Sequence, residues 1–193
     1  MITDQDAIEN YMLIDIDPSF ADQIESWILG AQQYMNKVTD RYLVADTTAA
    51  EYKYDGTGLR SVVIDDFVDI DSVFDGETDI TDDVLFYPAN DTPKWRLESD
   101  NLKFTKGRQN ITVTGKRGFA TQADLDTKYS DLKFAATVLV AGIINYGYSG
   151  TVGDREVVSE SIGQYSVTYE KGSKQKEDFN NIKSTLRQYR RIR

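Results

Sequence analysis

The sequence predicts an α+β protein, in which a small antiparallel β module is inserted into a helical bundle. Three observations lead to this fold class. Apolar residues recur with a helical period of about 3.6 residues between positions 20 and 38. Between about positions 50 and 118 the segments are short and polar and apolar residues alternate, which is typical of strands. A broad apolar helical pattern then returns at positions 132–144.

These changes of period also predict the domain organisation. We expect residues 1–44 and 119–193 to form one helical core, and residues 45–118 to form the inserted β module.

The N-terminal part reads as two helices. Thr3 is a candidate N-cap for a short helix that ends near Met12. Asp17 can cap the next helix, because Pro18 suits its first position. The long helix carries one apolar stripe, with Trp27 at its centre as an expected core anchor. The stripe consists of Phe20, Ile24, Trp27, Ile28, Ala31, Tyr34, Met35 and Val38.

The middle of the chain contains short β-type segments separated by glycine, proline and asparagine turns. The expected strands are centred on Tyr52–Tyr54, Ser61–Ile64, Asp71–Phe74, Val84–Tyr87, Lys94–Leu97 and Asn110–Thr114.

The last third returns to helices. We expect the helix around 132–144 to be central, since its apolar face is broad. Residues 159–170 alternate like a strand pair or an extended arm, and we expect residues from about 176 to 193 to form a final helix. The shared apolar face of that helix contains Phe179, Ile182, Leu186 and Tyr189.

Composition excludes several function classes. The chain has 193 residues, a net charge of −10, and neither cysteine nor histidine. Thiolate chemistry, disulfides, the usual zinc ligands and the commonest general base are therefore absent. The longest apolar run has eleven residues, whereas a membrane helix needs about twenty. With an acidic, polar N-terminus, the chain is expected to be soluble and to lack an export signal.

An acidic run inside the β segment is the main candidate for a metal site. It consists of Asp65, Asp66, Asp69, Asp71, Asp75, Glu77, Asp79, Asp82 and Asp83. The stretch Asp71–Gly76 has valine where a calcium loop needs its second oxygen ligand. We therefore favour an exposed acidic surface, and we expect no metal, cofactor or catalytic residues. A metal-dependent enzyme or glycan-binding module that uses this run is the alternative.

The C-terminal segment has the opposite charge. Residues 171–193 contain eight basic and two acidic side chains, whereas the rest of the chain is strongly acidic. This segment can contact nucleic acid, dock on an acidic partner or form a solvated helix face. Opposite charges at two ends favour head-to-tail association. The candidate docking residues are Lys183, Arg187, Arg190, Arg191 and Arg193.

Several stretches together resemble the head–tail connector proteins of tailed bacteriophages, also called adaptor or head-completion proteins. The N-terminal stretch 6–15 and the long helix ending at 38–42 resemble the opening of that family. The stretches 54–58, 87–90 and 107–115 resemble its longer members, which carry a β insertion. Residues 159–169 (SESIGQYSVTY) resemble the family's Ser-Glu-x-Ile-Gly-Asp-Tyr-Ser-Val stretch, with Gln164 in place of the usual acidic residue.

The resemblance implies a structural virion protein and not an enzyme. About twelve copies would form a closed ring under the portal, extend the DNA channel and present a surface to a stopper or tail-completion protein. The protein would then be found in the virion neck, and in the host cytoplasm during assembly. DNA would pass through the channel without specific binding, since an acidic wall repels phosphate. The free protein could remain monomeric until the portal templates the ring.

Overall fold

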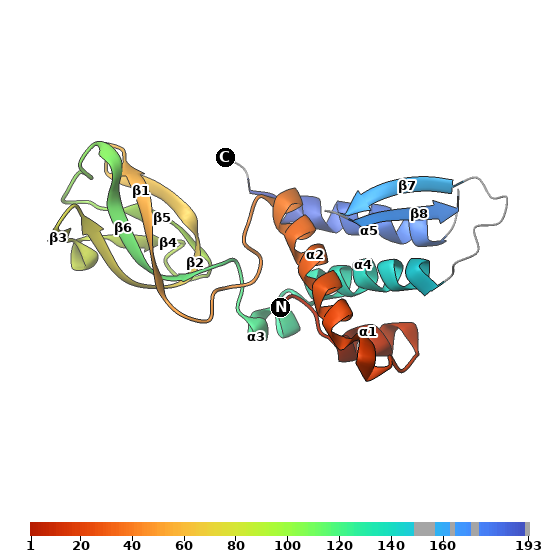
Figure 1. Cartoon of the computed structure of the whole chain (residues 1–193). Coiled ribbons are helices and arrows are strands. Elements are labelled where there is room, and N and C mark those ends of the chain that lie inside the picture. The colour runs from red at the N-terminus through yellow and green to blue at the C-terminus, as the bar shows by residue number, and fades with distance from the viewer. Residues whose placement is uncertain (149–156, 163–164, 171–173, 192–193) are drawn as a thin grey trace. The chain divides into compact units, whose positions relative to one another are not determined.

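The computed structural model describes residues 1–148, 157–162, 165–170 and 174–191 (Figure 1). It combines helices with antiparallel sheet, so the predicted α+β class is confirmed. The chain divides into two compact units. The helical unit comprises Met1–Asp40 and Gln122–Arg193, and the β unit comprises Arg41–Thr121.

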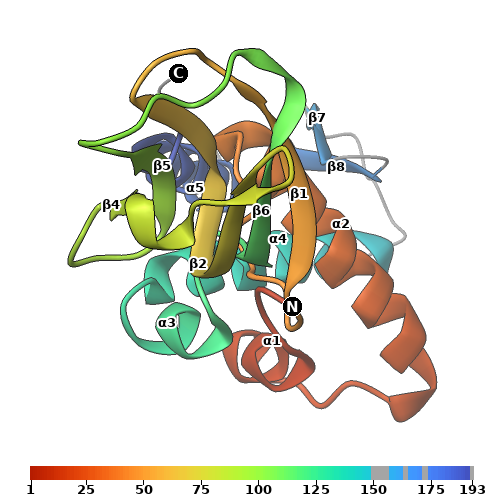
Figure 2. The same cartoon turned by 90° about the vertical axis from the view of Figure 1, so that its left-hand side faces the viewer.

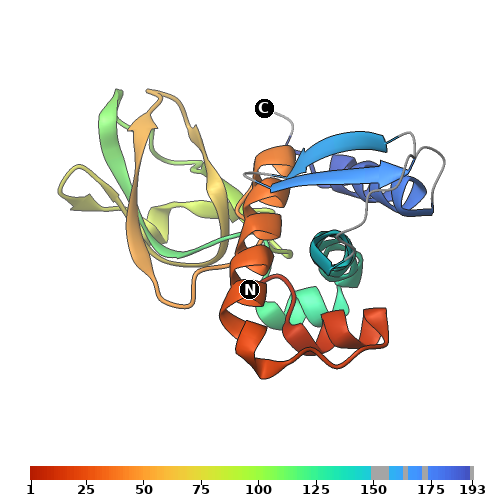
Figure 3. The same ribbon diagram turned by 45° about the vertical axis from the view of Figure 1, so that its right-hand side comes forward.

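The helical unit is built around α4. Its helices are α1 (Gln5–Met12), the short 3₁₀ helix η1 (Pro18–Phe20), α2 (Ala21–Thr39), α3 (Gln122–Thr127), α4 (Ser130–Tyr148) and α5 (Lys174–Gln188). A hairpin of β7 (Val157–Ile162) and β8 (Tyr165–Glu170) completes it, as the alternation at 159–170 predicts. Helix α4, seen almost end-on in Figure 3, contacts α1, α2, α3 and α5.

The central position of α4 follows from its sequence. Every residue of its predicted apolar face is at most 7% exposed: Leu132, Ala135, Ala136, Leu139, Val140, Ile143 and Ile144. A helix that is apolar around most of its circumference must be surrounded by other elements. The prediction of a central helix is therefore confirmed.

Helix α2 buries only part of its predicted stripe. Ile24, Ile28, Ala31 and Met35 are at most 3% exposed, but Phe20 is 37% exposed. Trp27 is half-buried and lies beside a groove. The expectation that Trp27 anchors the core is wrong, because its position on α2 lies at the edge of the buried face and not at its centre.

The N-terminal cap of α1 also differs from the prediction. Asp4, not Thr3, caps the helix, and its side chain accepts a 2.8 Å hydrogen bond from the Ala7 N–H. Thr3 is buried, and its hydroxyl lies 2.7 Å from the hydroxyl of Thr137 on α4. The sequence cannot rank two neighbouring cap residues, since the choice depends on which one the core buries. Asp17 does act as a cap, because it accepts from the Ser19 N–H, but it caps the 3₁₀ helix η1. The long helix α2 begins only at Ala21, with Phe20 at its N-cap, so the expected helix start at Pro18 is wrong.

Lys133 ties three helices of this unit together. Its ammonium group lies 2.7 Å from Asp126 at the end of α3 and 2.9 Å from Asp4 at the start of α1. Hydrogen bonding to Asp126 and then to Asp4 raises the pKa of Lys133 above its usual value. Burial opposes ionisation of Asp4, but the bonds from Lys133 and Ala7 outweigh it, so the pKa of Asp4 is lowered.

The β unit is a six-stranded antiparallel sheet. Its strands are β1 (Ala50–Gly56), β2 (Ser61–Asp75), β3 (Thr78–Asp79), β4 (Leu85–Tyr87), β5 (Lys94–Glu98) and β6 (Gly107–Arg117), with a 3₁₀ turn η2 at Thr81–Asp83. The order is β1-β6-β2-β5-β4 (Figure 2), and β3 pairs with β2. Its core includes Phe67, Leu97, Phe104, Ile111 and Val113, all fully buried.

Strand β2 corrects one expectation. Ser61–Ile64 and Asp71–Phe74 read as two strands, but one 15-residue strand contains both. The register shifts between Val63 and Phe67, and twice more before its end. These irregularities bend β2, so its first part pairs with β5 and its second part with β6. The acidic residues Asp65 and Asp66 therefore lie where one strand bends, and not in a loop between two strands.

The two chain segments at the base of the β unit are joined to each other. Val44 pairs with Ala120 in a parallel bridge, and the Ala45 N–H donates to the Ala120 carbonyl. A Cβ on Gly118 would lie 2.2 Å from the Ala45 Cα, so the close approach requires glycine.

Candidate functional site

The basic end of α5 carries the docking residues that the sequence predicts. Ile182 and Leu186 are 5% and 0% exposed, so the apolar face of the helix packs as expected. The side chain of Phe179 lies outside the described residues. On the polar side Arg187 and Arg190 are exposed, whereas Lys183 and Arg191 are half-buried. Arg193 lies outside the described residues. Docking by this surface stays a prediction.

The end of α5 is held firmly within its own unit. The Tyr189 hydroxyl donates to the Asp131 carboxylate, 2.9 Å from each oxygen, and its ring packs edge-on against Tyr129. Burial, and then the bond to Asp131, raise the pKa of Tyr189 to about 12. The Arg191 N–H donates to the Thr39 carbonyl at the C-terminus of α2. These contacts fix the position of the exposed arginines next to them.

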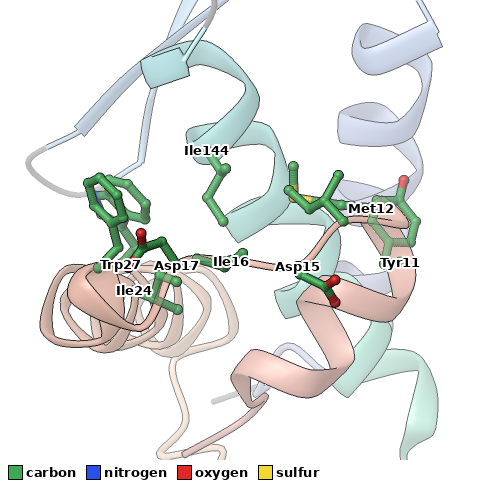
Figure 4. A pocket seen from close by; sticks show the side chains of 10 residues that line it. Tyr11, Met12, Asp15, Ile16, Asp17, Ile24, Trp27 and Ile144 are labelled. Carbon is green, nitrogen blue, oxygen red and sulfur yellow. The ribbon is translucent and has the colours of Figure 1, made fainter.

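A groove lies at the other end of α2. Its volume is about 700 Å³, and side chains from α1, the α1–α2 connection, α2 and α4 line it (Figure 4). The lining residues are Tyr11, Met12, Ile14, Asp15, Ile16, Asp17, Phe20, Ile24, Trp27 and Ile144. Three of them have aromatic rings and two have carboxylates, so the groove offers both apolar and acidic contacts.

Exposed apolar side chains concentrate around this groove. Leu13 is 89% exposed, Ile14 43%, Tyr11 40% and Phe20 37%. Large apolar groups that gather on one surface indicate an interaction site. This site was not predicted from the sequence, although Tyr11–Ile14 is a run of four apolar residues, more than one face of α1 can bury.

The surroundings of the groove are acidic. The first 40 residues contain eight Asp and Glu side chains and one Lys. At the groove itself, the bonds from the Ser19 backbone and side chain lower the pKa of Asp17 below its usual value. The groove therefore presents negative charge to any partner at neutral pH.

The acidic run of the β unit does not form a metal site in the described part of the chain. Its side chains bond separate partners: Asp66 with Arg41, Asp65 with Arg117, and Asp79 with Thr81. Among the residues that the structure describes, no group of three or more Asp and Glu side chains could hold a metal ion. The alternative of a metal-dependent β module therefore gains no support from this geometry.

Arginine–aromatic stacking recurs in the β unit. The Arg117 guanidinium lies 3.9 Å from the ring centre of Tyr42 and 4.3 Å from that of Tyr52. Arg96 similarly lies 5.1 Å from the rings of Tyr87 and Trp95. Such contacts pair a weakly hydrated cation with the negative face of a ring.

The comparisons with known proteins bear on the fold. No protein-family model matches the sequence, and no curated protein matches it. A solved structure does match: a chain from the neck of an empty GTA (gene transfer agent) particle, computed with C6 symmetry. The match covers 96% of this chain and 88% of that chain, with a TM-score of 0.52 and 12% sequence identity. This protein therefore has a fold that also occurs in the neck of a phage-like particle.

None of the described helices is both long enough and apolar enough to span a membrane.

Proposed function

We propose that this protein is a structural neck protein of a tailed-phage-like particle, and that it forms a ring between the portal and a stopper or tail-completion protein. The observation that carries the proposal is the fold similarity to a chain of a GTA neck over nearly the whole length. The ordered sequence resemblance to head–tail connectors is independent support, since it rests on motifs and not on coordinates.

The copy number is part of this proposal. The resemblance to connectors implies about twelve copies in a closed ring. The similar neck was computed with C6 symmetry, and twelve is a multiple of six. Twelve copies are therefore compatible with that symmetry.

The charge of the chain suits a channel wall. With a net charge of −10, a ring of copies would carry a strongly negative field. DNA-binding proteins gain affinity by releasing counterions from phosphates, which requires cationic surfaces. An acidic lumen does the reverse, and DNA can move past it without being retained. The basic end of α5 would then contact acidic protein surfaces and not the duplex.

Electron microscopy of the protein mixed with its own portal protein tests the proposal. The expected result is an additional ring of density at one end of the portal, whose symmetry gives the copy number directly. Portal alone is the control. If the protein sediments separately from the portal and no extra density appears at low or moderate salt, the protein is not a portal-bound ring component.

A further inference from the structure

The chemistry of the groove suits an arginine. Tyr11, Phe20 and Trp27 supply ring faces, and Asp15 and Asp17 supply carboxylates in the same groove. A guanidinium can stack on a ring while it donates two parallel hydrogen bonds to a carboxylate, which a lysine ammonium cannot do. Its aliphatic stem can also cover exposed apolar surface.

The chain already uses this combination within the β unit. Arg117 stacks between Tyr42 and Tyr52 and lies 3.8 Å from the Asp65 carboxylate. Two aromatic rings and one carboxylate therefore hold one arginine, with the same types of side chain that line the groove.

Arginines that could enter the groove are exposed at the end of α5, but those of the same copy cannot reach it. Arg191 is bonded to Thr39, at the C-terminus of α2, whereas the groove lies beside Ile24 near its N-terminus. The two positions are fifteen residues apart on one helix, or about 22 Å. Arg187 and Arg190 lie within about one turn of Arg191, and their side chains are too short to cover that distance.

We propose that the arginine-bearing end of α5 in one copy, with Arg187 and Arg190, docks into the α1–α2 groove of a second copy. The cationic surface and the acidic groove lie at opposite ends of α2, so the contact is head-to-tail. A head-to-tail contact that repeats around an axis closes a ring. This inference rests on the proposed function for ring closure, while the contact between two copies can be tested without the portal.

Cysteine cross-linking tests the contact, because the natural chain contains no cysteine. One variant carries Ile14→Cys at the groove, and a second carries Gln188→Cys between the exposed arginines. The two purified variants are mixed at high concentration, so that a contact too weak to assemble the dilute free protein is still populated, and treated with a short bis-maleimide. We expect a 14–188 heterodimer, identified by mass spectrometry, in clear excess over 14–14 and 188–188 homodimers. Leu13→Cys, at an 89% exposed position, replaces Ile14→Cys if that variant misfolds.

Charge reversal with rescue makes the test specific. Adding Arg187→Glu and Arg190→Glu to the Gln188→Cys partner should lower the heterodimer yield about tenfold, which corresponds to about 1.4 kcal/mol. Adding Asp15→Arg to the variant with the groove cysteine should restore part of the lost heterodimer yield. Arg108→Glu, an exposed reversal in the β unit, is the matched control and should have no effect.

The outcomes separate this inference from the proposed function. A heterodimer yield equal to that of random collisions, or one that survives the double reversal, overturns the docking contact. If rings nevertheless form on the portal, the neck function stands and another surface closes the ring. If the heterodimer forms but no ring binds the portal, the contact stands and the neck function fails.

Discussion

Removal of Arg41 should destabilise the β unit strongly, because it breaks an ion pair with a buried carboxylate. Arg41 Nη1 lies 2.7 and 2.8 Å from the two oxygens of Asp66. The Asp66 side chain is only 2% exposed, and the guanidinium also lies 5.1 Å from the ring centre of Phe119. Breaking a buried pair by removal of one partner costs about 3–5 kcal/mol. We expect a loss of that size for Arg41→Ala.

The chain offers a convenient assay, since each unit contains one of the two tryptophans. In a Trp27→Phe background, Trp95 alone reports unfolding of the β unit in urea. Arg108→Ala is the control, because this arginine of the β unit is exposed and such surface substitutions change stability by about 0.5 kcal/mol or less.

A double variant distinguishes the lost pair from lost packing. Arg41→Met with Asp66→Leu removes both charges together, and it should recover most of the stability that Arg41→Ala loses. A loss below about 1 kcal/mol for Arg41→Ala would contradict this prediction, because water or another cation would then be compensating Asp66. A large loss that the double variant does not recover would assign the effect to packing.

Three further predictions address the helical unit. Replacement of residues 41–121 by a Gly/Ser linker should leave a helical protein that melts cooperatively by circular dichroism; loss of the cooperative transition would mean that the two units share one folding core. Met35→Ala should lower the free energy of unfolding in urea by about 2–5 kcal/mol, and Trp27→Ala should lower it clearly less, because Trp27 is only half-buried. Equal losses would contradict the position of Trp27 at the edge of the buried face. Tyr189 stabilises the fold fully below pH 10, its unfolded pKa, and this contribution disappears as the pH rises through about 12. Tyr189→Phe should therefore lower stability at neutral pH and have progressively less effect between pH 10 and 12; an effect that does not change over this range would show that the bond to Asp131 is not involved.

The sequence predicted those elements whose pattern repeats over many residues. The apolar face of α4 and the buried stripe Ile24–Met35 of α2 have a helical period that local chemistry enforces. The alternation at residues 159–170 likewise predicted the β7–β8 pair. The side chain of Asp17 caps η1 through a neighbour two residues away, so the capping residue needed no distant contact, although the sequence assigned it to the long helix.

Predictions failed where the outcome depends on distant partners. The strand β2 continues through Asp65 and Asp66 because Arg41 and Arg117, far away in the sequence, compensate the two carboxylates. Asp4 and not Thr3 caps α1, because the hydroxyl of Thr3 is hydrogen-bonded to the hydroxyl of Thr137 on α4. In both places the partner of a polar side chain lies far away in the sequence, so a local sequence pattern could not reveal it.

The amino-acid sequence was sufficient to predict the α+β class, the change from helix to sheet and back, and the separation of acidic and basic segments. These properties follow from the periodicity of the sequence and from the charge summed along the chain. Neither quantity depends on which residues are in contact in the folded protein. The folded structure was needed to show that Trp27 lines a groove, and that this groove and the exposed arginines of α5 lie at opposite ends of α2. Burial and direction are set by the packing of α1, α2, α4 and α5 against one another, so the same apolar residue becomes a core or a docking surface according to what covers it.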